Sequence, residues 1–137
     1  MSKKKIVVVG NGMVGHKFID NILQSGSDEF DVITFSEEPR LAYDRVQLTA
    51  YFKRGNADDL ALTSEEYYQS NGVNYLLNAR VAQLDTENKC VVTESGHTES
   101  YDTLILATGS FPFVPPIPGN DQEHCHVYRT IEDLDAI

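Results

Sequence analysis

A glycine-rich turn directly follows a short apolar run near the start of the chain. Residues 6–9 read Ile-Val-Val-Val, and residues 10–15 read Gly-Asn-Gly-Met-Val-Gly, which is the pattern G-x-G-x-x-G. Apolar residues then recur at helical spacing, at Val14, Phe18 and Ile22. A strand, a glycine turn and a helix in this order predict the first unit of a parallel α/β sheet. The same order is typical of proteins that bind a dinucleotide.

Each glycine of the motif has its own expected role. Gly10 allows the tight turn, Gly12 lets the backbone approach a pyrophosphate, and Gly15 lets the helix pack close to the strand. The helix N-terminus then offers free N–H groups and the positive end of its dipole to that anion. Glycine-rich turns also occur in other α/β proteins, so the motif gains its meaning from the strand before it and the helix after it.

The composition indicates about one domain and excludes some partners. The chain has 137 residues, of which 41% are hydrophobic, enough to bury a core. The net charge of −10 argues against a surface for nucleic acid or an anionic membrane. Cys90 and Cys125 do not form a C-x-x-C pair, so no disulfide scaffold is expected and a reducing cytoplasm is the expected location. No apolar stretch is long enough for a signal-peptide core or a membrane span, so no membrane partner is expected.

The pattern along the rest of the chain predicts a parallel sheet and a small antiparallel meander. The helix is expected over Met13–Ser25, a loop and short helix over residues 39–52, and further helix starts at a capping box in residues 63–66 and at Thr130. The expected parallel strands are Lys5–Val9, Asp31–Phe35, Val73–Leu77 and the run that begins at Thr103; those of the meander are Val81–Asp85, Cys90–Glu94 and Thr98–Tyr101.

An acidic pair follows the second expected strand. Glu37 lies about 20 positions beyond the glycine motif, where a carboxylate can accept hydrogen bonds from ribose hydroxyls. The alternative interpretation is an ordinary solvated turn carboxylate, and the neighbouring Glu38 keeps that alternative open.

A second motif lies far along the chain. Residues 101–109 read Tyr-Asp-Thr-Leu-Ile-Leu-Ala-Thr-Gly, a buried strand that ends in a turn of small residues. Together with the glycine motif, the acid after the second strand, the arginine in the next loop and the meander, this order resembles the FAD domain of the pyridine-nucleotide-dependent flavoprotein reductases. The resemblance covers nearly the whole chain. It implies an α/β, Rossmann-like FAD-binding domain of three layers, with a parallel sheet and a small antiparallel β-meander.

A narrower resemblance rests on residues 35–48, Phe-Ser-Glu-Glu-Pro-Arg-Leu-Ala-Tyr-Asp-Arg-Val-Gln-Leu, together with residues 9–15. These segments are similar to the start of the large subunit in assimilatory NAD(P)H-dependent nitrite reductases. In that group, electrons pass from a nicotinamide through FAD and iron–sulfur centres to siroheme, where nitrite becomes ammonia. Ferredoxin, rubredoxin and apoptosis-inducing-factor-like reductases share the region around Arg45. A reductase of that kind, or a non-catalytic nucleotide-binding module, therefore stays an alternative.

The resemblance also implies which residues hold FAD. The glycine motif would meet the pyrophosphate, Glu37 the adenosine ribose, and Arg45 the phosphates or the flavin edge. The backbone at Val81 would meet adenine, and residues 107–109 would close over the cofactor. The alternatives are a surface ion pair of Arg45 with Asp44 or a nearby acid, and a plain core position for Val81. The expected cofactor-binding residues are Gly10, Asn11, Gly12, Met13, Val14, Gly15, Glu37, Glu38, Arg45, Val81, Ala107, Thr108 and Gly109.

Departures from the family pattern limit what the chain can do alone. Several relatives carry a lysine near the flavin five positions after the arginine, where this chain has Ala50. The chain lacks a C-x-x-x-x-C dithiol after the second strand, a cysteine cluster for an iron–sulfur centre, and a second glycine motif for a nicotinamide. We therefore expect an incomplete fragment: residues 1–137 form the first segment of a discontinuous FAD domain. NAD(P)H, Fe–S and siroheme would bind to later domains of the same polypeptide, and the expected partners are these domains and a small nitrite reductase subunit.

No catalytic side chain and no metal site is expected within the sequence. It contains no recognisable arrangement of acid, base and nucleophile. The only suggestive ligand set is His-Cys-His at residues 124–126. Adjacent residues of an extended segment point to opposite faces, so these three side chains cannot easily hold one metal ion.

Overall fold

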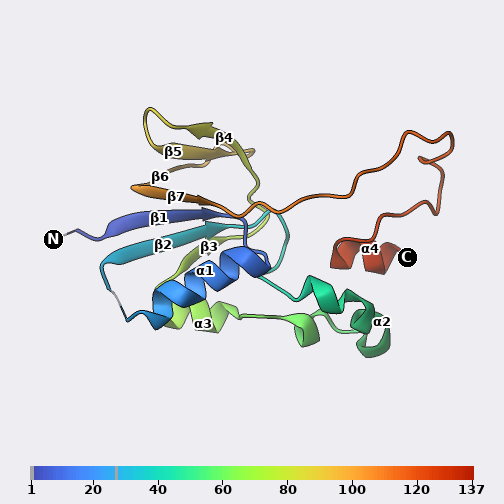
Figure 1. Ribbon diagram of the computed structural model, residues 1–137, viewed down its shortest axis with the longest axis horizontal. Coiled ribbons are helices and arrows are strands. Elements are labelled where there is room, and N and C mark those ends of the chain that lie inside the picture. The colour runs from blue at the N-terminus through green and yellow to red at the C-terminus, as the bar shows by residue number, and fades with distance from the viewer. Residues whose placement is uncertain (1, 27) are drawn as a thin grey trace. The chain divides into compact units, whose positions relative to one another are not determined.

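The computed structural model describes residues 2–26 and 28–137. The chain divides into two compact units. The first unit comprises Met1–Tyr43 and Leu62–Gly109, and the second comprises Asp44–Ala61 and Ser110–Ile137. The first unit contains the glycine motif and both β-sheets, whose strands are labelled in Figure 1.

A four-stranded parallel sheet forms the centre of the first unit. Its strands, in the order β3-β2-β1-β7, are β1 (Lys4–Val9), β2 (Phe30–Phe35), β3 (Asn74–Leu76) and β7 (Thr103–Leu106). In the register, Val9 lies opposite both Phe35 and Leu106, and Phe35 lies opposite Leu76. The carboxyl ends of all four strands therefore finish at one edge of the sheet, which is where ligands bind in open α/β sheets.

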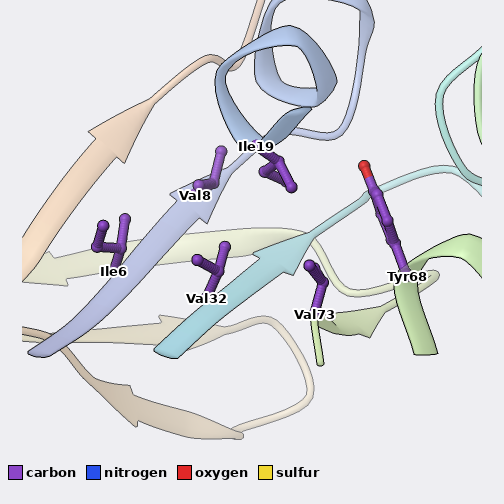
Figure 2. Close-up of a cluster of buried hydrophobic side chains, with 6 residues drawn as sticks. All are labelled: Ile6, Val8, Ile19, Val32, Tyr68 and Val73. Atoms are coloured by element: carbon purple, nitrogen blue, oxygen red, sulfur yellow. The ribbon is translucent and has the colours of Figure 1, made fainter. Parts of the chain in front are cut away.

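Helices cover one face of this sheet. Helix α1 (Met13–Gln24) and helix α3 (Glu65–Ser70) lie on the same side of it (Figure 1). Successive side chains of a strand point to opposite faces, so Ile6 and Val8 of β1 face the helices. Figure 2 shows the core between helices and sheet, whose buried residues are Ile6, Val8, Ile19, Val32, Tyr68 and Val73.

The antiparallel meander covers the other face. It consists of β4 (Val81–Asp85), β5 (Cys90–Thr93) and β6 (Thr98–Ser100), paired in that order. Val91 of β5 is fully buried against Val7, Val9 and Phe35, the side chains that point away from the helices. Helices, parallel sheet and meander thus make three layers, and the predicted fold class is confirmed.

The second unit has two short 3₁₀ helices and two short α-helices. These are η1 (Arg45–Ala50), α2 (Tyr51–Arg54), η2 (Ala57–Leu60) and α4 (Ile131–Ala136). The Thr130 side chain accepts a hydrogen bond from Asp133 N at 3.2 Å, and the Asp133 carboxylate accepts one from Thr130 N at 2.8 Å. This reciprocal capping box begins α4 where the sequence predicted a helix. In the part of the chain that the structure describes, no helix has both the length and the apolar composition needed to cross a membrane.

The predicted capping box at residues 63–66 is wrong by one position. Ser64 is the N-cap of α3, and its hydroxyl accepts a hydrogen bond from Tyr67 N at 3.1 Å. The residue three positions after this cap is therefore a tyrosine, which cannot return the bond as a glutamate would. Among the described residues, the Thr63 hydroxyl oxygen is buried without a hydrogen-bond partner.

Candidate functional site

The turn between β1 and α1 is built on two close backbone approaches. Gly10 has a φ of +106°, a conformation that favours glycine. A Cβ atom on Gly10 would overlap the carbonyl oxygen of Ala107, and a Cβ atom on Gly15 would overlap the carbonyl oxygen of Gly10. The glycines at these two positions therefore let the end of β7, the turn and the helix pack against one another.

Gly12 differs from the other two glycines of the motif. A Cβ atom there would meet no atom within 4 Å, so the backbone faces open space. Gly12 is also the N-cap of α1 in an extended conformation, and no side chain caps this helix end. The first turn contains no acidic residue, and its Val14 side chain is 73% exposed. An open, uncapped helix N-terminus has the N–H groups and the dipole that an anion requires.

Asn11, the residue between the first two glycines, directs its side chain into the protein. Its Nδ2 donates to the Tyr68 hydroxyl at 2.8 Å, and its Oδ1 accepts from Ala42 N at 2.8 Å. The Tyr68 hydroxyl also lies 2.9 Å from His16 Nδ1. Burial raises the pKa of Tyr68 to about 12 and lowers the pKa of His16 below its ordinary value.

The acidic pair after β2 divides into one exposed and one bonded side chain. The Glu37 carboxylate is 63% exposed, and its Oε2 lies 3.6 Å from Nε of Arg80. Arg80 also pairs with Glu94, with Nη1 and Oε1 2.9 Å apart. Glu38 accepts a hydrogen bond from the hydroxyl of the buried Tyr43 at 2.7 Å. Glu37 therefore has an exposed carboxylate that can accept hydrogen bonds from hydroxyl groups. The Glu38 carboxylate is instead bonded within its own loop, to Tyr43.

The segment after β7 completes this edge of the sheet. Ala107 N donates to Val9 O at 2.8 Å, which continues the pairing of β7 with β1. The Ala107 side chain lies 3.6 Å from the position that a Cβ atom on Gly15 would take. Thr108 and Gly109 are exposed, and Gly109 has a φ of +67°. The glycine turn and the end of β7, far apart in sequence, therefore lie side by side. Closure of residues 107–109 over a cofactor stays a prediction.

Val81 begins β4 and lies at the border of the core between the meander and the sheet. It is half-buried and packs against the cluster between the meander and the sheet. It pairs with Thr93, and the register shifts between Val81 and Gln83. Such an irregularity leaves backbone groups outside the regular ladder. Contact of this backbone with adenine stays a prediction.

Arg45 belongs to the second unit. It begins η1, and its Nη1 donates to the carbonyl oxygen of Arg129 at 2.9 Å. The Asp44 carboxylate caps the same helix by accepting from Val46 N at 3.0 Å. Contact of Arg45 with a phosphate or a flavin stays a prediction.

Three residues near the strand ends were not part of the predicted site. Arg80, Tyr43 and Tyr68 each bond to a residue that the sequence had singled out. Tyr68 is fully buried. A buried tyrosine hydroxyl needs a polar partner, and this rule is the signal by which sequence reasoning could have linked the tyrosines to the polar residues of the site.

Comparison with known proteins places this geometry in a family context. The profile of the pyridine nucleotide-disulphide oxidoreductases matches residues 4–137. The chain is 47% identical over 138 residues to the nitrite reductase (NADH) large subunit of Escherichia coli (strain K12), and 43% identical over 138 residues to the nitrite reductase [NAD(P)H] large subunit of Klebsiella oxytoca. Both matches include 100% of this chain, which spans 16% and 14% of the lengths of those relatives.

A solved structure of the same architecture is the water-forming NADH oxidase from Lactobacillus brevis bound to NADH. It superposes with a TM-score of 0.86 at 28% sequence identity. The match covers 98% of this chain and 31% of the oxidase.

Proposed function

The chain belongs to the pyridine nucleotide-disulphide oxidoreductase family, and on that premise we propose that it is the FAD-binding portion of an NAD(P)H-dependent nitrite reductase large subunit. The observation that carries FAD binding is the turn between β1 and α1, which is tightly packed at Gly10 and Gly15 and open at Gly12. The choice of nitrite reductase is supported by the 47% identity to the NADH-dependent enzyme of Escherichia coli along the whole chain.

The described residues fit the ADP half of FAD. The open backbone at Gly12 and the uncapped N-terminus of α1 suit a pyrophosphate, with Asn11, Met13 and Val14 contributing main-chain groups. The exposed Glu37 carboxylate suits ribose hydroxyls, and Glu38 keeps its loop in place. In the same proposal the backbone at Val81 meets adenine, residues 107–109 cover the cofactor and Arg45 meets its phosphates or flavin edge.

These residues bind and orient the cofactor. When FAD is bound, its flavin supplies the redox chemistry by which electrons from a reduced nicotinamide are passed on. No side chain of this chain is assigned a step in that chemistry. Its contribution is to hold the ADP half in one position, so that the flavin has a fixed place relative to whatever encloses it.

The other centres of the enzyme would lie outside residues 1–137. Hydride transfer needs a nicotinamide site, and this sequence contains one G-x-G-x-x-G motif. We therefore assign NAD(P)H, the Fe–S cluster and siroheme to later domains of the same polypeptide, which works in the cytoplasm with a small subunit. The relatives' greater length supports this assignment, since the chain spans 14–16% of them.

Turnover by the purified protein that carries this chain tests the activity. We expect NADH or NADPH oxidation to depend on nitrite and to yield ammonium. Turnover with rubredoxin or ferredoxin, but not with nitrite, would favour the alternative reductase. Bound FAD without turnover on any of these acceptors would favour a nucleotide-binding module.

A further inference from the structure

The side chain of Asn11 connects three segments of the first unit. Its Oδ1 accepts the N–H of Ala42, and its Nδ2 donates to the hydroxyl of Tyr68 on α3, each at 2.8 Å. Asn11 is itself 7% exposed, and the Tyr68 side chain is fully buried. In Figure 2 the Tyr68 ring extends away from α3 with its hydroxyl oxygen at the tip. A residue of the glycine turn is thus bonded both to a helix and to the segment after β2.

The segment that Asn11 holds is the one that carries the acidic pair. The hydroxyl of Tyr43 donates to Glu38 at 2.7 Å, which closes the loop on itself. The hydroxyl of Ser36, at the start of this loop, donates a hydrogen bond to the carbonyl oxygen of Glu38 at 3.3 Å. The hydrogen bond from Ala42 N to Asn11 therefore joins the glycine turn to a loop that is held together by its own hydrogen bonds.

The N–H group of Ala42 fixes the direction of the hydrogen bonds that Asn11 makes. Ala42 N can only donate, so the Asn11 oxygen must face it and the Asn11 amide nitrogen must face Tyr68. The Tyr68 hydroxyl then accepts from Asn11 and has its own proton to give to His16 Nδ1, 2.9 Å away. His16 must be neutral to accept this proton, and its burial, which lowers its pKa, favours that form. Each member of the chain of bonds has a partner of the correct type.

We infer that Asn11 is a positioning residue that sets the spacing between the pyrophosphate-binding turn and the ribose-binding loop, and that Tyr68 and His16 hold Asn11 in place. This inference rests on the proposed function. A dinucleotide spans both places, so its affinity depends on having them at a fixed separation before it binds. Asn11 would act on the cofactor through the position of the loop, without a side-chain contact to it.

The test compares FAD dissociation constants in the protein that carries this chain. Asn11→Ala removes the connection, and Tyr68→Phe removes one oxygen atom while keeping the ring. Tyr67→Phe is the matched control, because Tyr67 lies on the same helix and bonds to Asp20 of α1 at 2.8 Å, away from the turn. We expect FAD to bind about tenfold more weakly to Asn11→Ala, a few-fold more weakly to Tyr68→Phe, and unchanged within about twofold to Tyr67→Phe.

Two readouts separate positioning from a loss of stability. The double variant Asn11→Ala/Tyr68→Phe should bind FAD no more weakly than Asn11→Ala alone, since the two side chains act through one connection. In the FAD-free protein, the amide hydrogen of Ala42 should exchange with solvent faster in Asn11→Ala than in the wild type, and at the wild-type rate in Tyr67→Phe. Additive effects on affinity, or unchanged exchange at Ala42, would contradict the inference.

The outcomes also distinguish this inference from the proposed function. A wild-type protein that binds FAD, with variants of equal affinity, would overturn the role of Asn11 and leave the function standing. A wild-type protein that does not bind FAD would overturn both. If Asn11→Ala fails to fold, Tyr68→Phe against Tyr67→Phe decides the matter alone, because each variant lacks a single hydroxyl group.

Discussion

The carbonyl oxygen of Gly10 occupies the space that a Cβ atom on Gly15 would need. At Gly12, between them, a Cβ atom would meet nothing within 4 Å. The glycines of one motif therefore serve different purposes. Gly10 and Gly15 are required by the packing of the protein itself, whereas the folded chain gives no internal reason for glycine at position 12. Under the proposed function, the close approach of the FAD pyrophosphate to the backbone supplies such a reason.

Alanine substitutions should separate these purposes. Gly15→Ala should lower the free energy of unfolding by about 1–3 kcal/mol, the usual cost of overpacking, and should weaken FAD binding as well. Gly12→Ala should cost less stability than Gly15→Ala, because Gly12 has a φ of −94° and open space around it and only its role as the N-cap of α1 is weakened. It should nevertheless weaken FAD binding about tenfold, as measured by flavin fluorescence titration. Wild-type affinity in Gly12→Ala would contradict the role given to this glycine.

The two acids after β2 should respond in opposite ways. Glu37→Ala should weaken FAD binding at least tenfold, since a hydrogen bond to a charged group contributes about 1.5–3 kcal/mol. Glu38→Ala should affect FAD binding much less and stability more, because Glu38 accepts the hydroxyl of the buried Tyr43. Urea unfolding and FAD titration of both variants check this. Equal and small effects on affinity would return Glu37 to the role of a solvated turn carboxylate.

Tyr68 should make stability depend on pH in the alkaline range. Its pKa is about 12 in the folded protein, against 10.0 for a free tyrosine. Between these values the folded chain keeps a proton that the unfolded chain has lost, so stability is fully present below pH 10 and falls as the pH rises towards 12. The loss amounts to about 2–3 kcal/mol.

Comparison with Tyr68→Phe isolates this contribution from those of the other titrating groups. The difference in free energy of unfolding between the wild type and Tyr68→Phe should decrease between pH 9 and pH 12, measured by urea unfolding at each pH. Parallel pH dependences for the two proteins would show that the Tyr68 hydroxyl is not shielded from water as described.

The isolated chain of 137 residues should show no turnover. Hydride transfer requires the nicotinamide and flavin rings to approach within about 3–3.5 Å, and one dinucleotide motif does not supply two such sites. We expect no NAD(P)H oxidase, diaphorase or nitrite reductase activity, and weak FAD binding because the flavin end stays open to water. Steady oxidation of NADH by this chain with added FAD, beyond the rate with FAD alone, would contradict the partial-domain proposal.

Local sequence signals were sufficient to predict the strand, the glycine turn and the helix with which the chain begins. The β-branched run of β1, the glycine turn and the apolar spacing of α1 are all set by neighbouring residues, and the structure has these elements where they were predicted. The one-residue error at Thr63 arose because two adjacent hydroxyl residues can each cap a helix. The direction from which the chain enters α3 decides between them, and that is not a local property.

The connections within the candidate site could not be predicted in the same way. Asn11 and Tyr68 lie 57 positions apart, and their bond depends on how α3 packs over the sheet. The pairing of Glu37 with Arg80 likewise depends on where the meander leaves β3. Sequence patterns identify which residues have suitable chemistry, whereas the tertiary packing decides which of them meet.

The flavin content of the purified protein that carries this chain is the most direct test of the central proposal. Absorbance and fluorescence after release of the cofactor should identify FAD at about one per polypeptide, in the wild type as isolated or after incubation with FAD. The variant Gly12→Ala, measured under conditions where urea unfolding shows it to be folded, should retain much less. A wild-type protein that purifies colourless and gains no flavin absorbance on addition of FAD would contradict the assignment of this fold to FAD binding.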